Sequence, residues 1–162
     1  MKNRATVERT SERELVVTRT VNGPARLVFE AWTRPELFRQ WWVPKSFPLT
    51  LLSFEADVRA GGRYRLVFGY GDSTMEFFGT YLEVTPYSRL VWTNDEGEDG
   101  GAVTTVTFEE KAGKTLLVVH DLHPSKEALD AAIASGATTG MPESLEQLDE
   151  LLVTLGANAG RS

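Results

Sequence analysis

The spacing of apolar residues changes three times along the chain, and each change predicts a different kind of element. Residues 1–12 are polar, carry both signs of charge and show no period, so they predict a flexible leader. Leu15, Val16 and Val17 open a first strand, which should close near Gly23. The folded domain is therefore expected to begin at about residue 13.

Two short helices are predicted after this strand. Pro24 suits the first turn of a helix, and apolar residues recur at helical spacing from there to Trp32. Pro35 can start a second helix for the same reason, because a first turn does not need the amide hydrogen that proline lacks. Pro44 and Pro48 prevent this helix from continuing, so the chain should then become extended.

The segment from Leu49 to Leu122 is dominated by β-branched and aromatic residues, which favour strands. Turn-forming residues interrupt it often enough to delimit six strands, and connections this short predict antiparallel pairing. Tyr64, Leu66 and Phe68 alternate with arginines, so one face of the predicted sheet is apolar and the other faces water.

The helical period returns in the last third of the chain. Ser125 is suited to cap a helix that runs through Ala134. A longer helix follows, with apolar residues recurring at intervals of four, three, four and three: Met141, Leu145, Leu148, Leu152 and Leu155. Gly156 is placed to end this helix, and residues 157–162 are expected to form a flexible tail.

This order of elements predicts one α+β domain over residues 13–156. Its expected parts are a seven-stranded antiparallel sheet, two short helices after the first strand and a long C-terminal helix. An apolar sheet face cannot remain in water, and the C-terminal helix presents the long apolar stripe that can cover it. We therefore expect the sheet to curve around that helix.

Composition and charge exclude several classes of function. The chain of 162 residues has a net charge of −6 and a pI near 5.0, which argues against nucleic acid and anionic lipid as partners. It contains no cysteine, so disulfides, thiol nucleophiles and cysteine-ligated metals are excluded, and neither a metal nor another cofactor is expected. With no secretory signal and no long apolar run, we expect a cytoplasmic protein that does not insert into membranes.

Aromatic residues are distributed very unevenly. Of the 16 Phe, Trp and Tyr residues, 15 fall between Phe29 and Trp92, and three of the four tryptophans are Trp32, Trp41 and Trp42. Two interpretations stay open at this point. The aromatic side chains either simply fill the core of that half of the domain, or line a cavity left where one helix incompletely fills a curved sheet.

Ionisable residues give weaker signals. His120 and His123 are an odd number of positions apart near a strand end, so they should face opposite sides and make poor ligands for one metal ion. Glu76, Asp57 and Arg59 lie in the strand region, where an exposed sheet surface is the ordinary interpretation and a cavity-facing charge the alternative. Motifs of serine hydrolases, phosphate-binding loops and dinucleotide-binding folds are absent.

Several segments together resemble a known family. They are NGPA at 22–25 leading into VFEAWT at 28–33, PELFRQWWVP at 35–44, DVRAGGRY at 57–64, GTYLEV at 79–84, RLVWT at 89–93, and the start of the C-terminal helix from Gly140 to Leu148. The chain resembles the SRPBCC superfamily, also called START-like or Bet v 1-like. Its branch is the one named after the activator of heat-shock protein 90 ATPase. The resemblance covers about residues 13 to 155.

The resemblance implies a helix-grip fold with a deep cavity between sheet and helix. Members of the superfamily bind or transport apolar small molecules, some are polyketide cyclases or aromatases, and the eukaryotic namesake stimulates a chaperone ATPase. That namesake has an additional N-terminal chaperone-binding domain, which we do not expect here. Met141 is a departure, because the branch usually has a tryptophan after the glycine at this point.

We therefore expect a non-catalytic protein that sequesters or carries a small hydrophobic ligand, aromatic in the sharper form of the prediction. The residues expected to contact the ligand are Trp32, Trp41, Trp42, Phe54, Tyr64, Phe68, Tyr81, Trp92, His120, Met141, Leu145 and Leu148. One alternative is a cyclase or aromatase-like enzyme using His120, Glu76 or Arg59 as the ionisable group. The other is an interaction protein that binds a chaperone or forms a homodimer.

Overall fold

One antiparallel sheet forms the frame of the molecule. The computed structural model describes residues 6–43, 45–94, 102–134 and 141–159. Within these residues the strands are β1 (Thr6–Arg9), β2 (Glu14–Val21), β3 (Thr50–Ala56), β4 (Arg63–Tyr70), β5 (Ser73–Thr85), β6 (Arg89–Thr93), β7 (Val103–Lys111) and β8 (Lys114–Leu122). Their order in the sheet is β1-β2-β8-β7-β6-β5-β4-β3.

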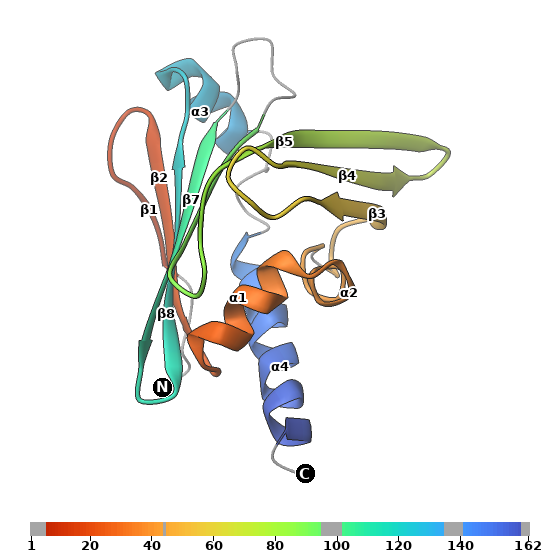
Figure 1. Ribbon diagram of the computed structural model, residues 1–162. Coiled ribbons are helices and arrows are strands. Elements are labelled where there is room, and N and C mark those ends of the chain that lie inside the picture. Colours follow the sequence, from red (N-terminus) through yellow and green to blue (C-terminus); the bar gives the residue numbers. More distant parts are fainter. Residues whose placement is uncertain (1–5, 44, 95–101, 135–140, 160–162) are drawn as a thin grey trace.

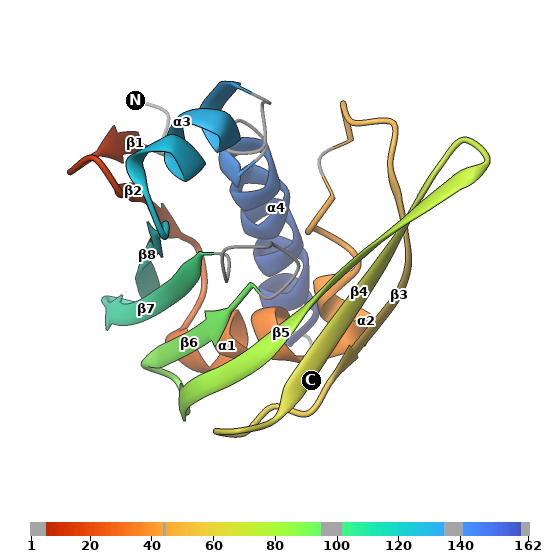
Figure 2. The same ribbon diagram turned by 90° about the horizontal axis from the view of Figure 1, so that it is seen from above.

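Helices lie on the inner side of this sheet. They are α1 (Ala25–Thr33), α2 (Pro35–Phe38), α3 (Lys126–Ala134) and α4 (Met141–Ala159). Figure 1 shows α1 in front of α4 between the two wings of the sheet. Seen from above in Figure 2, the strands curve around α4, and α3 lies next to β1 and β2. The curved α+β arrangement around a C-terminal helix is the predicted one.

Alternation along the strands decides which side is inner. On β2, every second residue from Leu15 to Val21 is buried, Arg19 included, while the residues that alternate with them are partly exposed. On β8, Leu117 and Val119 are buried in the same way, and Val17 lies opposite Val119 in the strand pairing. Neighbouring inward residues thus line up across strands, as the pleat of a sheet requires.

The structure differs from the sequence prediction at both ends of the domain. Thr6–Arg9 form β1, an eighth strand that pairs with β2, although these residues were predicted to belong to a flexible leader. All four are exposed, so the strand has no buried face and leaves no alternating pattern in the sequence. At the other end α4 continues to Ala159, past the predicted stop at Gly156.

Helix α4 is held against β2 by a buried acidic residue. Asp149 accepts hydrogen bonds from the backbone amide of Asn22 at 2.7 Å and from the Asn22 side chain at 3.0 Å. It also pairs with Arg19 at 3.2 Å, and the side chains of Arg19 and Asp149 are only 8% and 14% exposed. The carboxylate therefore pairs with Nη2 of a buried guanidinium and bonds the turn before α1, while Nε of Arg19 has no hydrogen-bond partner among the described residues.

The other side of α4 is fixed to the segment that follows α2. Gln147 donates to the carbonyls of Trp41 and Val43 at 2.9 Å each and accepts from the amide of Lys45 at 2.8 Å. Ser144 donates to the carbonyl of Trp42 at 2.7 Å. This chain segment lies outside the strands and helices, and α4 supplies hydrogen bonds that orient the tryptophan pair.

Replacing Asp149 tests how much the fold depends on this contact. Asp149→Ala leaves the guanidinium of Arg19 buried without its counter-charge, so we expect the free energy of unfolding to fall by about 3 kcal/mol. Urea denaturation followed by circular dichroism measures it. Glu36→Ala is the control, since Glu36 pairs with Arg34 at an exposed position and should change stability little. Equal effects of the two variants would contradict the assigned role of Asp149.

Candidate functional site

An aromatic cluster occupies the space between α1, the segment after α2 and the sheet. Trp32 is at its centre, with ring centroids 4.8 Å from Trp41, 5.8 Å from Trp42 and 5.9 Å from Trp92. Most of these contacts are edge-to-face, the geometry that aromatic pairs prefer. The pairing brings together three chain segments that are distant in sequence.

A second group of rings extends the cluster over β3. Phe38 lies 4.3 Å from Phe54 and is stacked on Trp42 at 4.7 Å, measured between ring centroids. Helix α2 is only four residues long, so these ring contacts hold it in place. The aromatic residues are therefore part of the core, as the first of the two sequence interpretations predicted.

Exposure is graded across the cluster. Trp41 and Trp32 are fully buried, with 0% and 2% of their surface exposed. Four other members are only partly buried and pack against the same core from its margin: Trp42, Phe54, Trp92 and Met141. We call these four the apolar rim. The rim is the part of this cluster that is partly accessible from solvent.

Two buried indole groups in the cluster differ in their hydrogen bonding. Nε1 of Trp41 donates to the carbonyl of Ala31 at 3.0 Å. Nε1 of Trp32 is equally buried but has no hydrogen-bond partner in the part of the chain that the structure describes. A buried donor left unpaired costs about 1–3 kcal/mol, so such groups are rare and call for an explanation. Trp32 therefore has the capacity to bind an acceptor that the protein itself does not provide.

Polar side chains form a second feature of the inner face, at the end of the sheet near α3. Thr104 donates to Oδ1 of Asp121 at 2.5 Å and accepts from the side-chain amide of Asn94 at 3.1 Å. Oδ1 of Asn94 lies 3.3 Å from the hydroxyl of Tyr64, which also donates to the carbonyl of Thr93 at 2.7 Å. We call Tyr64, Asn94, Thr104 and Asp121 the polar row.

The strand register joins the polar row to the aromatic cluster. Tyr81 on β5 pairs with Trp92 on β6, Trp92 with Thr104 on β7, and Thr104 with Asp121 on β8. Directly paired residues point to the same side of a sheet, so these four side chains follow one line across the inner face. The line runs from an aromatic end to an acidic end.

Burial changes the acidity of two residues in this line. Desolvation raises the pKa of Asp121 despite the hydrogen bond from Thr104 and the nearby His123 and His120, which act in the opposite direction. Burial also raises the pKa of the Tyr81 hydroxyl, which therefore stays protonated at neutral pH. A desolvated carboxyl group on a concave surface is a candidate for binding or proton transfer.

A glycine makes room for the ring of Tyr64. A Cβ atom added to Gly79 would lie 1.8 Å from the carbonyl oxygen of Thr93 and 2.8 Å from the Tyr64 ring. No side chain can be accommodated there, because strands β5 and β6 approach closely beside the ring. Gly79 thereby allows the Tyr64 hydroxyl to reach Thr93 and Asn94.

All of the predicted ligand contacts except His120 belong to one apolar cluster: Trp32, Trp41, Trp42, Phe54, Tyr64, Phe68, Tyr81, Trp92, Met141, Leu145 and Leu148. That they contact a ligand stays a prediction. His120 was placed wrongly. It alternates with the buried Val119 and lies on the outer face, where its Nε2 is 2.9 Å from Glu14.

The ionisable groups considered for catalysis are also on the outside. Glu76 pairs with Arg65 at 2.9 Å on an exposed surface of the sheet, and Arg59 pairs with Asp57 at 2.8 Å. Asp121 was not among the residues predicted for the site. Its signal was the strand alternation itself, since Leu117, Val119 and Asp121 share one face of β8.

A hollow on the outer surface does not match the predicted cavity. It measures about 600 Å³ and is lined by Glu55, Ala56, Asp57, Arg63, Tyr64, Arg65, Glu76 and Phe78. Most of these side chains are charged and exposed, and oppositely charged members neutralise each other. This groove therefore lacks the apolar lining expected of a hydrophobic ligand site.

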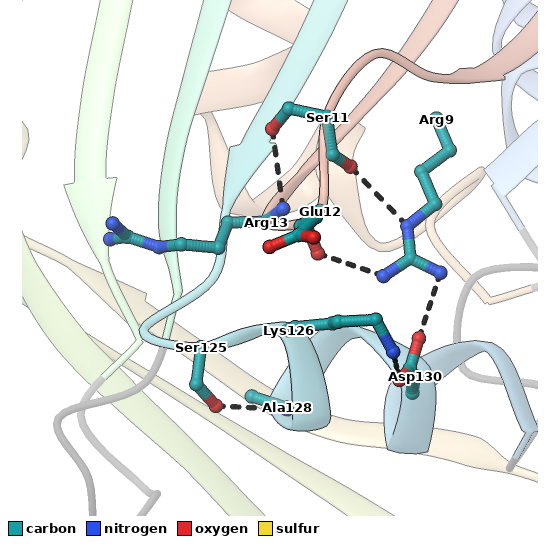
Figure 3. A network of polar contacts seen from close by, with 8 residues as sticks. All are labelled: Arg9, Ser11, Glu12, Arg13, Ser125, Lys126, Ala128 and Asp130. Carbon is teal, nitrogen blue, oxygen red and sulfur yellow. Dashed lines mark hydrogen bonds and ion pairs between the residues drawn. The ribbon is translucent and has the colours of Figure 1, made fainter.

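The N-terminal hairpin fixes the end of the sheet beside Asp121. Figure 3 shows the guanidinium of Arg9 between the turn after β1 and helix α3, where it donates to the carbonyl of Glu12 and pairs with Asp130, both at 2.8 Å. Ser125 caps α3 by accepting from the amide of Ala128, as predicted. Because strand β1 was not predicted from the sequence, the contacts of Arg9 with Glu12 and Asp130 were not predicted either.

Fold and site together define the class of protein. A curved antiparallel sheet, two short helices after the second strand and a long C-terminal helix on an aromatic inner face constitute a helix-grip domain of the SRPBCC type. The family model described as Activator of Hsp90 ATPase homolog 1-like protein matches residues 22–153. The chain belongs to this family.

Solved structures share this fold. A protein from Nitrosomonas europaea is 25% identical, covers 92% of this chain and 99% of its own, and superposes with a TM-score of 0.82. One from Rhodobacter sphaeroides is 22% identical, with a TM-score of 0.84 and coverage of 93% and 99%. An AHSA1-like protein from Aeromonas hydrophila is 20% identical, with a TM-score of 0.62 and coverage of 81% and 92%.

No curated protein matches the chain. Among the described residues, no helix combines the length and the apolar character needed to cross a bilayer.

The raised pKa of Asp121 predicts a pH-dependent effect on stability. Between the ordinary pKa of aspartate and the raised value, the folded chain binds the proton more tightly than the unfolded chain, so stability falls as pH rises through this window. Asp121→Asn removes this loss. We expect the variant to exceed wild type in free energy of unfolding at pH 7.5, with the difference shrinking towards pH 3.5.

Urea denaturation at the two pH values measures the difference. Glu109→Gln, which changes an exposed carboxylate on neighbouring strand β7, is the control and should show no such pH-dependent gain. A gain for Asp121→Asn that is constant with pH, or a loss at pH 7.5 only, would contradict the burial of an ionised carboxylate at this position.

Proposed function

We propose that the inner face binds a small hydrophobic ligand, without covalent chemistry, and that the protein sequesters or carries it. The observation that carries the proposal is the buried indole Nε1 of Trp32, which has no acceptor among the described residues. A bound molecule with a carbonyl, ether or hydroxyl oxygen would satisfy it once neighbouring side chains move to admit that oxygen. The apolar rim of Trp42, Phe54, Trp92 and Met141 would supply the contact surface beside it.

The size of the hydrophobic effect makes this binding feasible. A ligand that loses about 250 Å² of apolar surface gains roughly 6 kcal/mol before the costs of association are subtracted. Aromatic walls add orientation-dependent contacts of about 0.5–1.5 kcal/mol per ring pair. A dissociation constant of 1 mM corresponds to about 4.1 kcal/mol and one of 1 μM to about 8.2 kcal/mol, so after the costs of association these contacts support weak binding without a covalent bond or a metal.

The family relationship supports the proposal and leaves the ligand open. Helix-grip domains of the SRPBCC type commonly bind hydrophobic ligands, and this chain has the fold and the aromatic inner face. The family name refers to activation of a chaperone ATPase. Chaperone binding, homodimer formation and cyclase activity stay predictions of the sequence, and no contact in the structure favours one of them over ligand binding.

Prodan, an uncharged naphthalene ketone whose emission moves to the blue in apolar surroundings, is a suitable first probe. It presents both an aromatic body for the rim and a carbonyl acceptor for Trp32. We expect saturable binding with a dissociation constant of about 1 mM or below. Trp42→Ala and Phe54→Ala should each weaken binding about tenfold, which corresponds to about 1.4 kcal/mol of lost contact.

Leu82→Ala is the matched control, because Leu82 is 52% exposed and lies away from the aromatic cluster. Its affinity for Prodan should equal that of wild type. Thermal denaturation of each variant shows whether the fold is kept, and the two rim variants serve as replicates if one is unstable. Absence of saturable binding to wild type, or equal binding by the rim variants and wild type, would refute the proposed function.

A further inference from the structure

We infer that Asp121 anchors the ligand by a hydrogen-bond donor, so that the preferred ligands are hydrophobic molecules with a hydroxyl or amino group at one end. This inference rests on the proposed function and specifies the chemistry of its ligand.

Asp121 is placed to receive a donor. One of its carboxylate oxygens, Oδ1, is held by the hydroxyl of Thr104 at 2.5 Å. The described residues provide no hydrogen-bond donor for Oδ2, and this oxygen is not completely shielded from solvent. A half-buried carboxylate with one oxygen oriented and the other accessible is a preorganised acceptor.

The neighbours of Asp121 fix its orientation and do not neutralise it through a salt bridge. Thr104 is itself held by the amide of Asn94 at 3.1 Å, so the hydroxyl that donates to Asp121 cannot turn away without losing a hydrogen bond. The titratable groups that act on the carboxylate are His120 and His123. Burial lowers the pKa of His123, which keeps that imidazole neutral at physiological pH.

Such a carboxylate favours a ligand that carries a hydrogen-bond donor. A buried acidic group costs stability unless a partner compensates it. An alcohol or an ammonium group supplies that partner, whereas a carboxylate ligand would be repelled and a purely apolar ligand would leave Oδ2 unpaired. The polar row therefore discriminates between head groups rather than strengthening the binding of every apolar molecule.

The register also predicts the length of the ligand. Asp121 on β8 and Trp92 on β6 are separated by the single strand β7, and all three strands pair through Thr104. Neighbouring strands are about 4.8 Å apart, so the two side chains start about 10 Å from each other. A molecule of the size of a substituted naphthalene spans this distance, with its head group on Asp121 and its rings on Trp92.

Four probes that share one apolar body test the inference: 2-naphthylmethylamine, 2-naphthalenemethanol, 2-methylnaphthalene and 2-naphthoate. Their dissociation constants at pH 7.5 are measured by displacement of Prodan. We expect the amine and the alcohol to bind wild type at least tenfold more tightly than 2-methylnaphthalene, and 2-naphthoate to bind most weakly.

Substitutions at Asp121 test whether this residue causes the head-group preference. Asp121→Asn keeps an acceptor but loses the charge, so the amine should lose at least tenfold in affinity while the alcohol changes less than threefold. Asp121→Leu should abolish the preference for both and leave 2-methylnaphthalene bound as in wild type. Glu14→Gln is the matched control, because Glu14 lies at the same end of the sheet on the outer face.

The outcomes separate the two claims. If no naphthalene derivative binds wild type, the proposed function fails and the inference fails with it. If all four bind with equal affinity, or if Glu14→Gln alters the head-group preference as much as Asp121→Asn, ligand binding stands and the anchor is refuted. The preference within wild type decides the matter even if an Asp121 variant does not fold.

Discussion

The attachment of α4 to the curved sheet is the constraint on which the rest of the structure depends. Three leucines of the helix, Leu145, Leu148 and Leu152, are fully buried against the inner face. Hydrophobic contact alone does not fix the rotation of a helix on a sheet. Asp149 on one side and Gln147 on the other supply that specificity, through a partly buried bond to Arg19 on β2 and a buried bond to the chain after α2. Because Gln147 holds the carbonyls beside Trp41 and Trp42, the position of the aromatic cluster follows from the position of the helix.

The inner face thus combines a well-packed core with polar groups whose hydrogen-bonding capacity is only partly used. Trp41 satisfies its indole group internally, whereas Trp32 beside it does not. At the other end of the same surface, Asp121 is oriented by Thr104 but keeps an accessible oxygen. Groups of this kind lower stability unless something binds them. Their occurrence on one face, joined by the register through Trp92, is the physical reason for treating that face as a binding surface.

Much of the fold could be predicted from the sequence because its signals are local. Alternation in the strands, prolines at the starts of α1 and α2 and the leucine spacing of α4 each report one element, and the family resemblance agrees with their order. Strand β1 could not be predicted, since its exposed residues carry no pattern and its stability comes from pairing with β2. The end of α4 was missed because Gly156 can remain helical, at a modest cost, within a helix that is held by tertiary contacts.

The site could be predicted from the sequence only in part, for a related reason. Apolar cluster members were identified by residue type, but the facing of single polar residues depends on where each strand starts. His120 and Asp121 are adjacent, and the alternation that buries Leu117 and Val119 places Asp121 inward and His120 outward. His120 was chosen for its chemistry, whereas its position in the alternation places it on the outer face. The unpaired state of Trp32 could not be foreseen, because it depends on the three-dimensional positions of all possible acceptors.

The central claim, that a ligand occupies the inner face beside Trp32, is tested most directly by the indole N–H resonances of the four tryptophans in a ¹H–¹⁵N spectrum. Trp32→Phe and Trp41→Phe assign two of these signals. On titration with 2-naphthalenemethanol, the account predicts a large shift for the Nε1 proton of Trp32 and little change for that of Trp41, which is already bonded to Ala31. Indole signals that stay unmoved at saturating probe, or shifts confined to residues of the outer face, would contradict it.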